Sequence, residues 1–197
     1  MMIRFTTFSL IGAALVTLAA CSDPLDTAQY AIDPAPAKDT LPNRLGRAEL
    51  REISLPDYAS GQEIAFQTPD GALRSSPDNI WADDPKRAMT LALARQISEM
   101  SGATVIAEPW PLASDPQRKI EVRVDRFLAA ADGAVHLDGV YYVSPASYAA
   151  SGGDTVRRFD ITVPMGGVAG KAADPGLIAR TQSAALGQLA AQIAQMK

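Results

Sequence analysis

The only cysteine of this chain, Cys21, limits what can hold the folded chain together. A disulfide needs two cysteines, so the fold has to rest on an apolar core and not on intramolecular cross-links. The 197 residues are 47% hydrophobic and 20% charged, which is the balance of a globular protein. We therefore expect one domain with a core of useful size.

The residues before Cys21 have the layout of a secretory signal. Arg4 makes the start cationic, residues 5–16 are mostly apolar, and small residues lead to the cysteine. The apolar part runs about 15 residues, whereas a membrane-spanning helix needs about 20. We predict that residues 1–20 are a signal peptide that is removed.

The four residues Leu18-Ala19-Ala20-Cys21 resemble the bacterial lipobox at every position. The resemblance implies a diacylglyceryl group on the Cys21 sulfur, cleavage before Cys21 and acylation of the new amino group. A thiolate is the nucleophile best suited to forming that thioether. Three acyl chains would anchor the protein stably, because one chain alone gives only marginal membrane binding. The alternative is a free cysteine behind an ordinary cleaved signal.

The two residues after Cys21 bear on the destination of the mature chain. In enterobacteria-like lipoproteins an Asp directly after the cysteine resembles an inner-membrane retention signal, and here that position holds Ser22, with Asp23 following. We therefore predict an anchor in the outer membrane with the protein facing the periplasm.

Residues 21–47 are predicted to be the lipidated cysteine and an extended tether. Pro24, Pro34, Pro36 and Pro42 stand among small and polar residues, a composition typical of linkers. A short edge strand is predicted at Tyr30-Ala31-Ile32. The folded domain is expected to cover residues 48–197.

The first half of this domain mixes strands with one clear helix. Residues 48–56, 62–68 and 103–110 have the apolar patterns of strands. Between them, Asp84 and Pro85 predict the start of a helix, and Gly102 predicts its end.

The second half predicts an antiparallel meander followed by a helix. Residues 119–127, 134–143 and 155–163 alternate in hydrophobicity, with a bulge expected near Asp125 and Arg126 and a turn over 131–133. Asp174 and Pro175 predict the start of an Ala-rich last helix. The fold class is therefore α/β, a single domain in which helices pack on a mixed sheet.

Candidate chemistry in the chain is sparse. His136, the only histidine, shares a strand face with Asp138 and raises a Ser-His-Asp hydrolase as the enzyme hypothesis, but the chain has no Gly-x-Ser-x-Gly elbow. One histidine and one lipidated cysteine leave only carboxylates as metal ligands. We expect no metal, no cofactor and no catalysis.

Two further patterns favour simple interpretations. The loop 165–172 resembles a phosphate-binding loop, but its glycine spacing is one residue short and Ala172 replaces the hydroxyl that holds magnesium. Trp110, Tyr141 and Tyr142 could contact acyl chains, although strand aromatics are more often core and rim residues.

Basic residues are scattered and the net charge is -4, so nucleic acid is not an expected partner.

The order of these segments resembles the ABC-transport auxiliary lipoproteins of the PqiC type. The resemblance covers nearly the whole mature chain and rests on the acylated cysteine, the "YAIDPAPAKD" tether, the "RKIEVRVDRF" and "AVHLDGVYYV" hairpin and the Ala-rich last helix. Leu55-Pro56-Asp57-Tyr58 matches a Leu-Pro-x-Tyr segment, and Trp81 followed by Pro85 matches a Trp before a Pro-led helix.

The resemblance implies a role beside an inner-membrane ATPase and permease and a periplasmic MCE-domain protein, which together move lipid between the two membranes and maintain envelope integrity. It implies that this chain is the outer-membrane partner that binds the MCE protein. We also expect a homo-oligomer, because a ring of lipoproteins would match the equivalent docking sites of a multisubunit conduit. The alternative is a structural envelope lipoprotein that binds another outer-membrane component.

Overall fold

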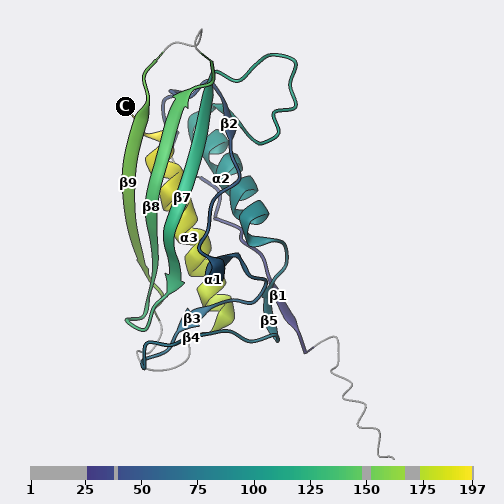
Figure 1. The fold of residues 1–197 in the computed structure, drawn as a ribbon, viewed down its shortest axis with the longest axis vertical. Coiled ribbons are helices and arrows are strands. Elements are labelled where there is room, and N and C mark those ends of the chain that lie inside the picture. Colours follow the sequence, from purple (N-terminus) through teal and green to yellow (C-terminus); the bar gives the residue numbers. More distant parts are fainter. Residues whose placement is uncertain (1–25, 38–39, 148–151, 167–173, 197) are drawn as a thin grey trace, which may run out of the picture.

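The computed structural model of the chain describes residues 26–37, 40–147, 152–166 and 174–196 (Figure 1). The described residues form helices and strands in the order β1(Ala28–Tyr30), β2(Arg47–Leu50), α1(Asp57–Ser60), β3(Phe66–Gln67), β4(Leu73–Arg74), β5(Asn79–Trp81), α2(Pro85–Ser101), β6(Thr104–Ala107), β7(Arg118–Ala129), β8(Ala134–Pro145), β9(Thr155–Pro164) and α3(Pro175–Ala194). Helices lie on a mixed sheet, which confirms the predicted α/β class.

The long strands β7, β8 and β9 form the predicted antiparallel meander. The register of β7 against β8 shifts between Val124 and Arg126, so the expected bulge is confirmed. At this point Gly139 lets the strands approach closely, because a Cβ there would lie 2.1 Å from the Arg123 carbonyl oxygen. The predicted turn closes with a hydrogen bond from the Gly133 amide to the Ala130 carbonyl.

The other edge of β7 carries two short parallel strands, one at each end. β2 pairs with the start of β7, and β3 pairs with its last residue, Ala129. Between them the chain touches β7 through the bridge of Ser54 with Arg123 and then detours through α1. Strand β6 pairs in parallel with β2, and β4 pairs antiparallel with β3. The sheet therefore contains both parallel and antiparallel pairs.

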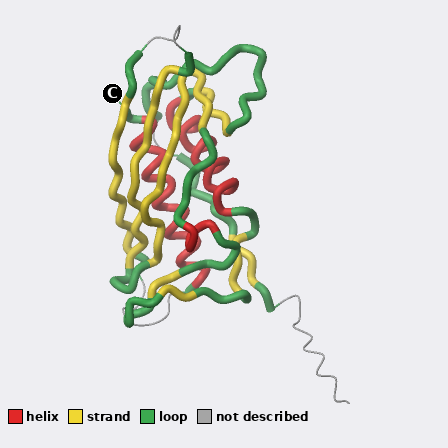
Figure 2. Tube along the Cα trace, in the orientation of Figure 1, coloured by secondary structure: helices red, strands yellow, loops and turns green. Residues whose placement is uncertain are grey.

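Helices α2 and α3 lie side by side against one face of the sheet (Figures 1 and 2). Both begin as predicted: the Asp84 side chain accepts a hydrogen bond from the Arg87 amide, and the Asp174 side chain accepts from the Gly176 and Leu177 amides. Gly102 ends α2 with a left-handed backbone, as expected. Helix α3 lies against the meander, and α2 lies against α3 and β6. Their apolar faces join the inward side chains of the sheet in one core, whose fully buried residues include Met89, Leu93, Ile97, Ile120, Val122, Val135, Leu137, Val143, Ile178, Leu186, Leu189 and Ile193.

The strands before α2 differ most from the sequence prediction. The strand expected over 48–56 is regular only to Leu50, and the one expected over 62–68 is reduced to Phe66–Gln67. Strands β4 and β5 and the helical turn α1 were not predicted. These elements are two to four residues long, too short for a hydrophobic period to be recognised.

The predicted tether over 21–47 is wrong for residues 28–37 and 40–47, here called the N-terminal segment. β1 pairs in parallel with β5 in a separate two-stranded sheet, Ile32 is 9% exposed, and Leu45 is 2% exposed. The Asp33 amide donates to the Ser183 hydroxyl at 3.0 Å, and the Leu41 amide donates to the Met100 carbonyl at 2.7 Å. The folded domain therefore starts near Ala28, and the short strand foreseen at residues 30–32 lies two residues earlier.

Candidate functional site

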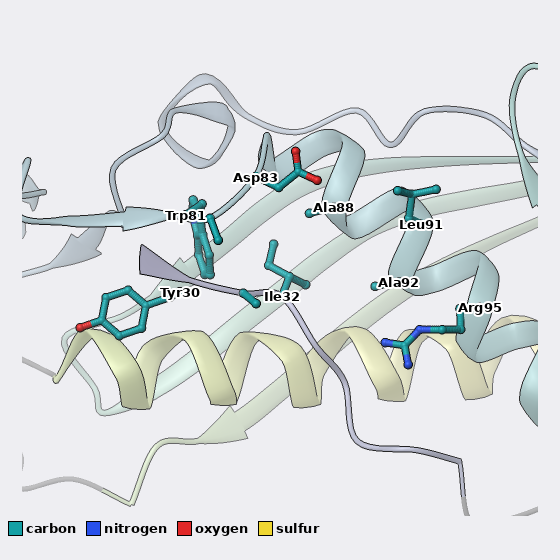
Figure 3. A pocket seen from close by; sticks show the side chains of 10 residues that line it. Tyr30, Ile32, Trp81, Asp83, Ala88, Leu91, Ala92 and Arg95 are labelled. Atoms are coloured by element: carbon teal, nitrogen blue, oxygen red, sulfur yellow. The ribbon is translucent and has the colours of Figure 1, made fainter. Parts of the chain in front are cut away.

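The N-terminal segment and helix α2 enclose an apolar groove of about 310 Å³ (Figure 3). Tyr30, Ile32 and Trp81 form one side of the groove, and Ala88, Leu91 and Ala92 of α2 form the other. Leu91 is 45% exposed, so part of its apolar side chain faces solvent. The groove is thus an open apolar surface at the edge of the core.

The β1–β5 pair positions the residues of this groove. The register places Tyr30 beside Trp81, and the Ala82 amide donates to the Tyr30 carbonyl at 2.8 Å. The Tyr30 hydroxyl donates to the Asn79 side chain at 3.2 Å, which leaves the ring facing the groove. Trp81 is 5% exposed and lines the groove beside Ile32.

The charged side chains at the groove are already paired. Arg95 lies 2.7 Å from the Asp33 carboxylate, and Asp83 pairs with Arg87. Figure 3 places Arg95 and Tyr30 toward opposite ends of the groove. The groove therefore offers apolar contact between two ion pairs and holds no nucleophile with an adjacent base.

His136 and Asp138 share the outer face of β8, as strand alternation predicted, but they do not pair with each other. The His136 Nε2 lies 2.7 Å from Asp132 Oδ2, its Nδ1 lies 3.2 Å from the Thr162 hydroxyl, and Asp138 instead pairs with Arg126. The hydrogen bond with His136 is the main reason that the pKa of Asp132 lies below its usual range. This cluster lies on the sheet face that the helices leave open, away from the apolar groove.

The open face of the meander is covered by polar side chains. Glu121 accepts hydrogen bonds from Arg123 and Arg51, which hold the pKa of Glu121 below its usual range. The Arg123 guanidinium lies 5.1 Å from the ring centroid of Tyr142. A face of this kind is a solvated surface and not an apolar binding site.

The aromatic candidates occupy core and rim positions, as the simpler interpretation predicted. Tyr141 is 4% exposed and stacks on Phe159 with 6.5 Å between ring centroids. Burial raises the pKa of Tyr141 above its usual range. Trp110 lies in the loop after β6, where its indole nitrogen donates to the Ser114 carbonyl.

The predicted anchor residues Cys21, Ser22 and Asp23 lie outside the described residues, and so do residues 167–172 of the loop that resembles a phosphate-binding loop. Within the described ranges, no three His, Cys, Asp or Glu side chains gather in a way that could hold a metal ion. In the same part of the chain, no helix has the length and apolar character to cross a membrane. The sequence analysis did not predict the apolar groove, because residues 28–37 have the composition of a linker and gave no sign that they pack against the helices.

A comparison with known protein families shows which family this chain belongs to. A model described as "ABC-type transport auxiliary lipoprotein component" matches residues 30–194. The chain belongs to this family. The match begins at Tyr30, so the family domain includes the N-terminal segment that packs on α2 and α3.

Solved structures share this fold at low sequence identity. One, titled as the crystal structure of an uncharacterized protein, has a TM-score of 0.62 and 22% identity and covers 79% of this chain and 94% of its own. The protein XCC0632 from Xanthomonas campestris, of the DUF330 family, has a TM-score of 0.60 and 16% identity and covers 85% of this chain and 90% of its own. The PelC dodecamer from Paraburkholderia phytofirmans is more distant, with a TM-score of 0.37 and 11% identity over 75% of this chain and 92% of its own. No curated protein matches the chain.

Proposed function

We propose that the mature protein is the outer-membrane lipoprotein of an MCE-type ABC transport system that moves lipids between the inner and outer membranes. The observation that carries this proposal is the match to the transport auxiliary family over residues 30–194. Membership makes the chain an auxiliary lipoprotein of an ABC-type system; the MCE partner, the lipid cargo and the role in envelope integrity are our proposals.

The anchor is proposed from the lipobox. Lipidation at Cys21, with Ser22 and Asp23 as the sorting residues, would hold the domain at the periplasmic face of the outer membrane. Since the folded domain starts near Ala28, only residues 22–27 separate it from the anchor. A chain of that length spans at most about 20 Å, so the domain would stay close to the membrane surface.

Binding, without catalysis or a cofactor, is the proposed mode of action. The apolar groove holds no acid–base pair, and ATP would be hydrolysed by a separate subunit. A homo-oligomer would present several copies of the domain to a conduit of several subunits, which raises avidity without stronger single contacts.

Co-purification tests this proposal. The lipidated full-length protein in an uncharged detergent should retain the MCE protein encoded with it, and light scattering should give a mass above one protomer. Failure of the lipidated protein to bind that partner would remove the transport assignment. A strictly monomeric mass would remove the oligomer alone.

A further inference from the structure

Three arginines line a hollow of about 730 Å³ at the end of the sheet where β2 and β7 begin. Arg44 lies in the turn before β2, Arg47 is the first residue of β2, and Arg118 is the first residue of β7. We call this site the arginine hollow. It lies at the opposite end of the sheet from β3 and β4, which pair near the last residue of β7 (Figure 1).

Hydrogen bonds between three segments fix the walls of the arginine hollow. The Arg47 amide donates to the Gln117 side chain at 3.1 Å, and the Gln117 amide donates to the Arg47 carbonyl at 2.7 Å. The Ala146 amide donates to the Gln117 carbonyl at 3.0 Å, which brings in the segment that holds Ser147. Gly46 has a φ of 63°, and a Cβ there would lie 2.1 Å from the Gln117 side-chain oxygen. The three segments are therefore held in one arrangement.

Backbone carbonyls, and not carboxylates, hold two of the guanidinium groups. Arg47 Nε donates to the Asp115 carbonyl at 3.1 Å, and Arg118 Nη1 donates to the Gly153 carbonyl at 3.4 Å. Both side chains are half-buried. Each keeps further N–H donors that these carbonyls do not use.

Among the described residues, no carboxylate oxygen comes within 4.0 Å of the guanidinium groups of Arg44, Arg47 or Arg118. All ion pairs between described residues involve other basic side chains. Asp115 also lines the hollow, so three guanidinium groups face one carboxylate there. By contrast, Arg51 and Arg123 on the open sheet face share Glu121. The arginine hollow thus carries positive charge that its own described residues do not neutralise.

We propose that the arginine hollow binds a phosphate group. Guanidinium forks match phosphate oxygens in a bidentate geometry, and groups already oriented by backbone carbonyls lose less freedom on binding. The concave shape favours a compact tetrahedral anion with several donors around it over a single carboxylate of a protein segment. The phosphate could belong to a lipid headgroup, a source that rests on the proposed function, or to a free phosphate compound.

Calorimetric titration of the full-length lipidated protein, in an uncharged detergent, tests this site. The probes are glycerol 3-phosphate as a headgroup fragment, inorganic phosphate, glycerol, and hexaglutamate as a model acidic peptide. We expect saturable binding of glycerol 3-phosphate and none of glycerol. Arg47→Gln and Arg118→Gln should each weaken binding at least about tenfold, since each removes a charge-assisted contact. Arg44→Gln is the second variant should either of these fail to fold, because Arg44 is exposed.

Arg74→Gln is the matched control, because Arg74 pairs with Asp70 at the other end of the sheet. It should bind glycerol 3-phosphate as the unmodified protein does. Tighter binding of glycerol 3-phosphate than of inorganic phosphate supports a headgroup source, and equal binding supports a free phosphate source. Absence of saturable binding, binding that Arg47→Gln and Arg44→Gln leave unchanged, or a preference for hexaglutamate would overturn the proposal. Each result is independent of whether the MCE protein co-purifies.

Discussion

The meander β7–β9 and the N-terminal segment both contribute buried side chains to one core, but different contacts hold them. The meander is paired along its length by backbone hydrogen bonds, and its inward residues alternate with outward ones on each side of the bulge in β7. In the N-terminal segment, β1 pairs with the three-residue strand β5, and the residues that follow β1 are held by single contacts with α2 and α3, such as the hydrogen bond from the Asp33 amide to the Ser183 hydroxyl. The helices therefore determine where the N-terminal segment lies. We expect this segment to open locally, whereas the meander unfolds only with the whole domain.

Leu137→Ala in β8 should have the largest effect on stability. Leu137 is fully buried under the helices, and removing such a side chain costs about 2–5 kcal/mol. Urea unfolding should show a lower midpoint with an unchanged slope. Val140→Ala is the control on the half-buried outer side of the same strand and should cost clearly less. Equal losses for the two variants would mean that the meander does not carry the core.

Ile32→Ala in the N-terminal segment should have a smaller and local effect. Ile32 is 9% exposed at the edge of the core, so we expect a cost of about 1–2 kcal/mol, below the usual range for a fully buried isoleucine. Hydrogen exchange should accelerate at the amides of Ala28 and Asp33, with little change in β8. Uniform acceleration across the sheet would contradict the distinction between the two regions.

The same difference explains what the sequence could predict. Alternation over residues 119–127, 134–143 and 155–163 identified β7, β8 and β9, and Asp-Pro starts identified α2 and α3, because these signals are local. Pro34 and Pro36 gave the N-terminal segment the composition of a linker, although Pro34 is buried against the helices. No local period marks a segment that is held by the Ser183 hydroxyl, 150 residues away in the chain.

For the candidate site, too, the sequence revealed local patterns but not contacts between distant segments. The sequence placed His136 and Asp138 on the outer face of β8, and only the rejected hydrolase hypothesis would have paired them. The turn of residues 131–133 instead brings Asp132 back over the strand. The apolar groove and the arginine hollow both join segments more than 45 residues apart, which a single sequence does not reveal.

His136→Ala should have the smallest effect, since it changes only the open polar face of the meander. Without the hydrogen bond from His136, the pKa of Asp132 should rise toward its usual value, as NMR titration of the carboxyl would show. Because that pKa is depressed in the folded protein, the associated stability is present above the unfolded pKa, near 4, and is lost as the pH falls through the folded value. The carboxylate is exposed, so we expect a slight loss of stability at neutral pH.

Transport-dependent resistance to detergent should be intact in His136→Ala. Loss of resistance with normal folding and normal partner binding would indicate a catalytic role for the cluster of His136 and Asp132.

We propose that a lipid-anchored domain serves an envelope transport system, and the variant Cys21→Ser removes that anchor. Cells that carry only this variant should lack the membrane-bound mature protein, and in unmodified cells globomycin, an inhibitor of the lipoprotein signal peptidase, should cause the precursor to accumulate. The variant cells should become as sensitive to detergent as cells without the gene. Normal mature protein in the membrane, or full detergent resistance without the anchor, would contradict the account.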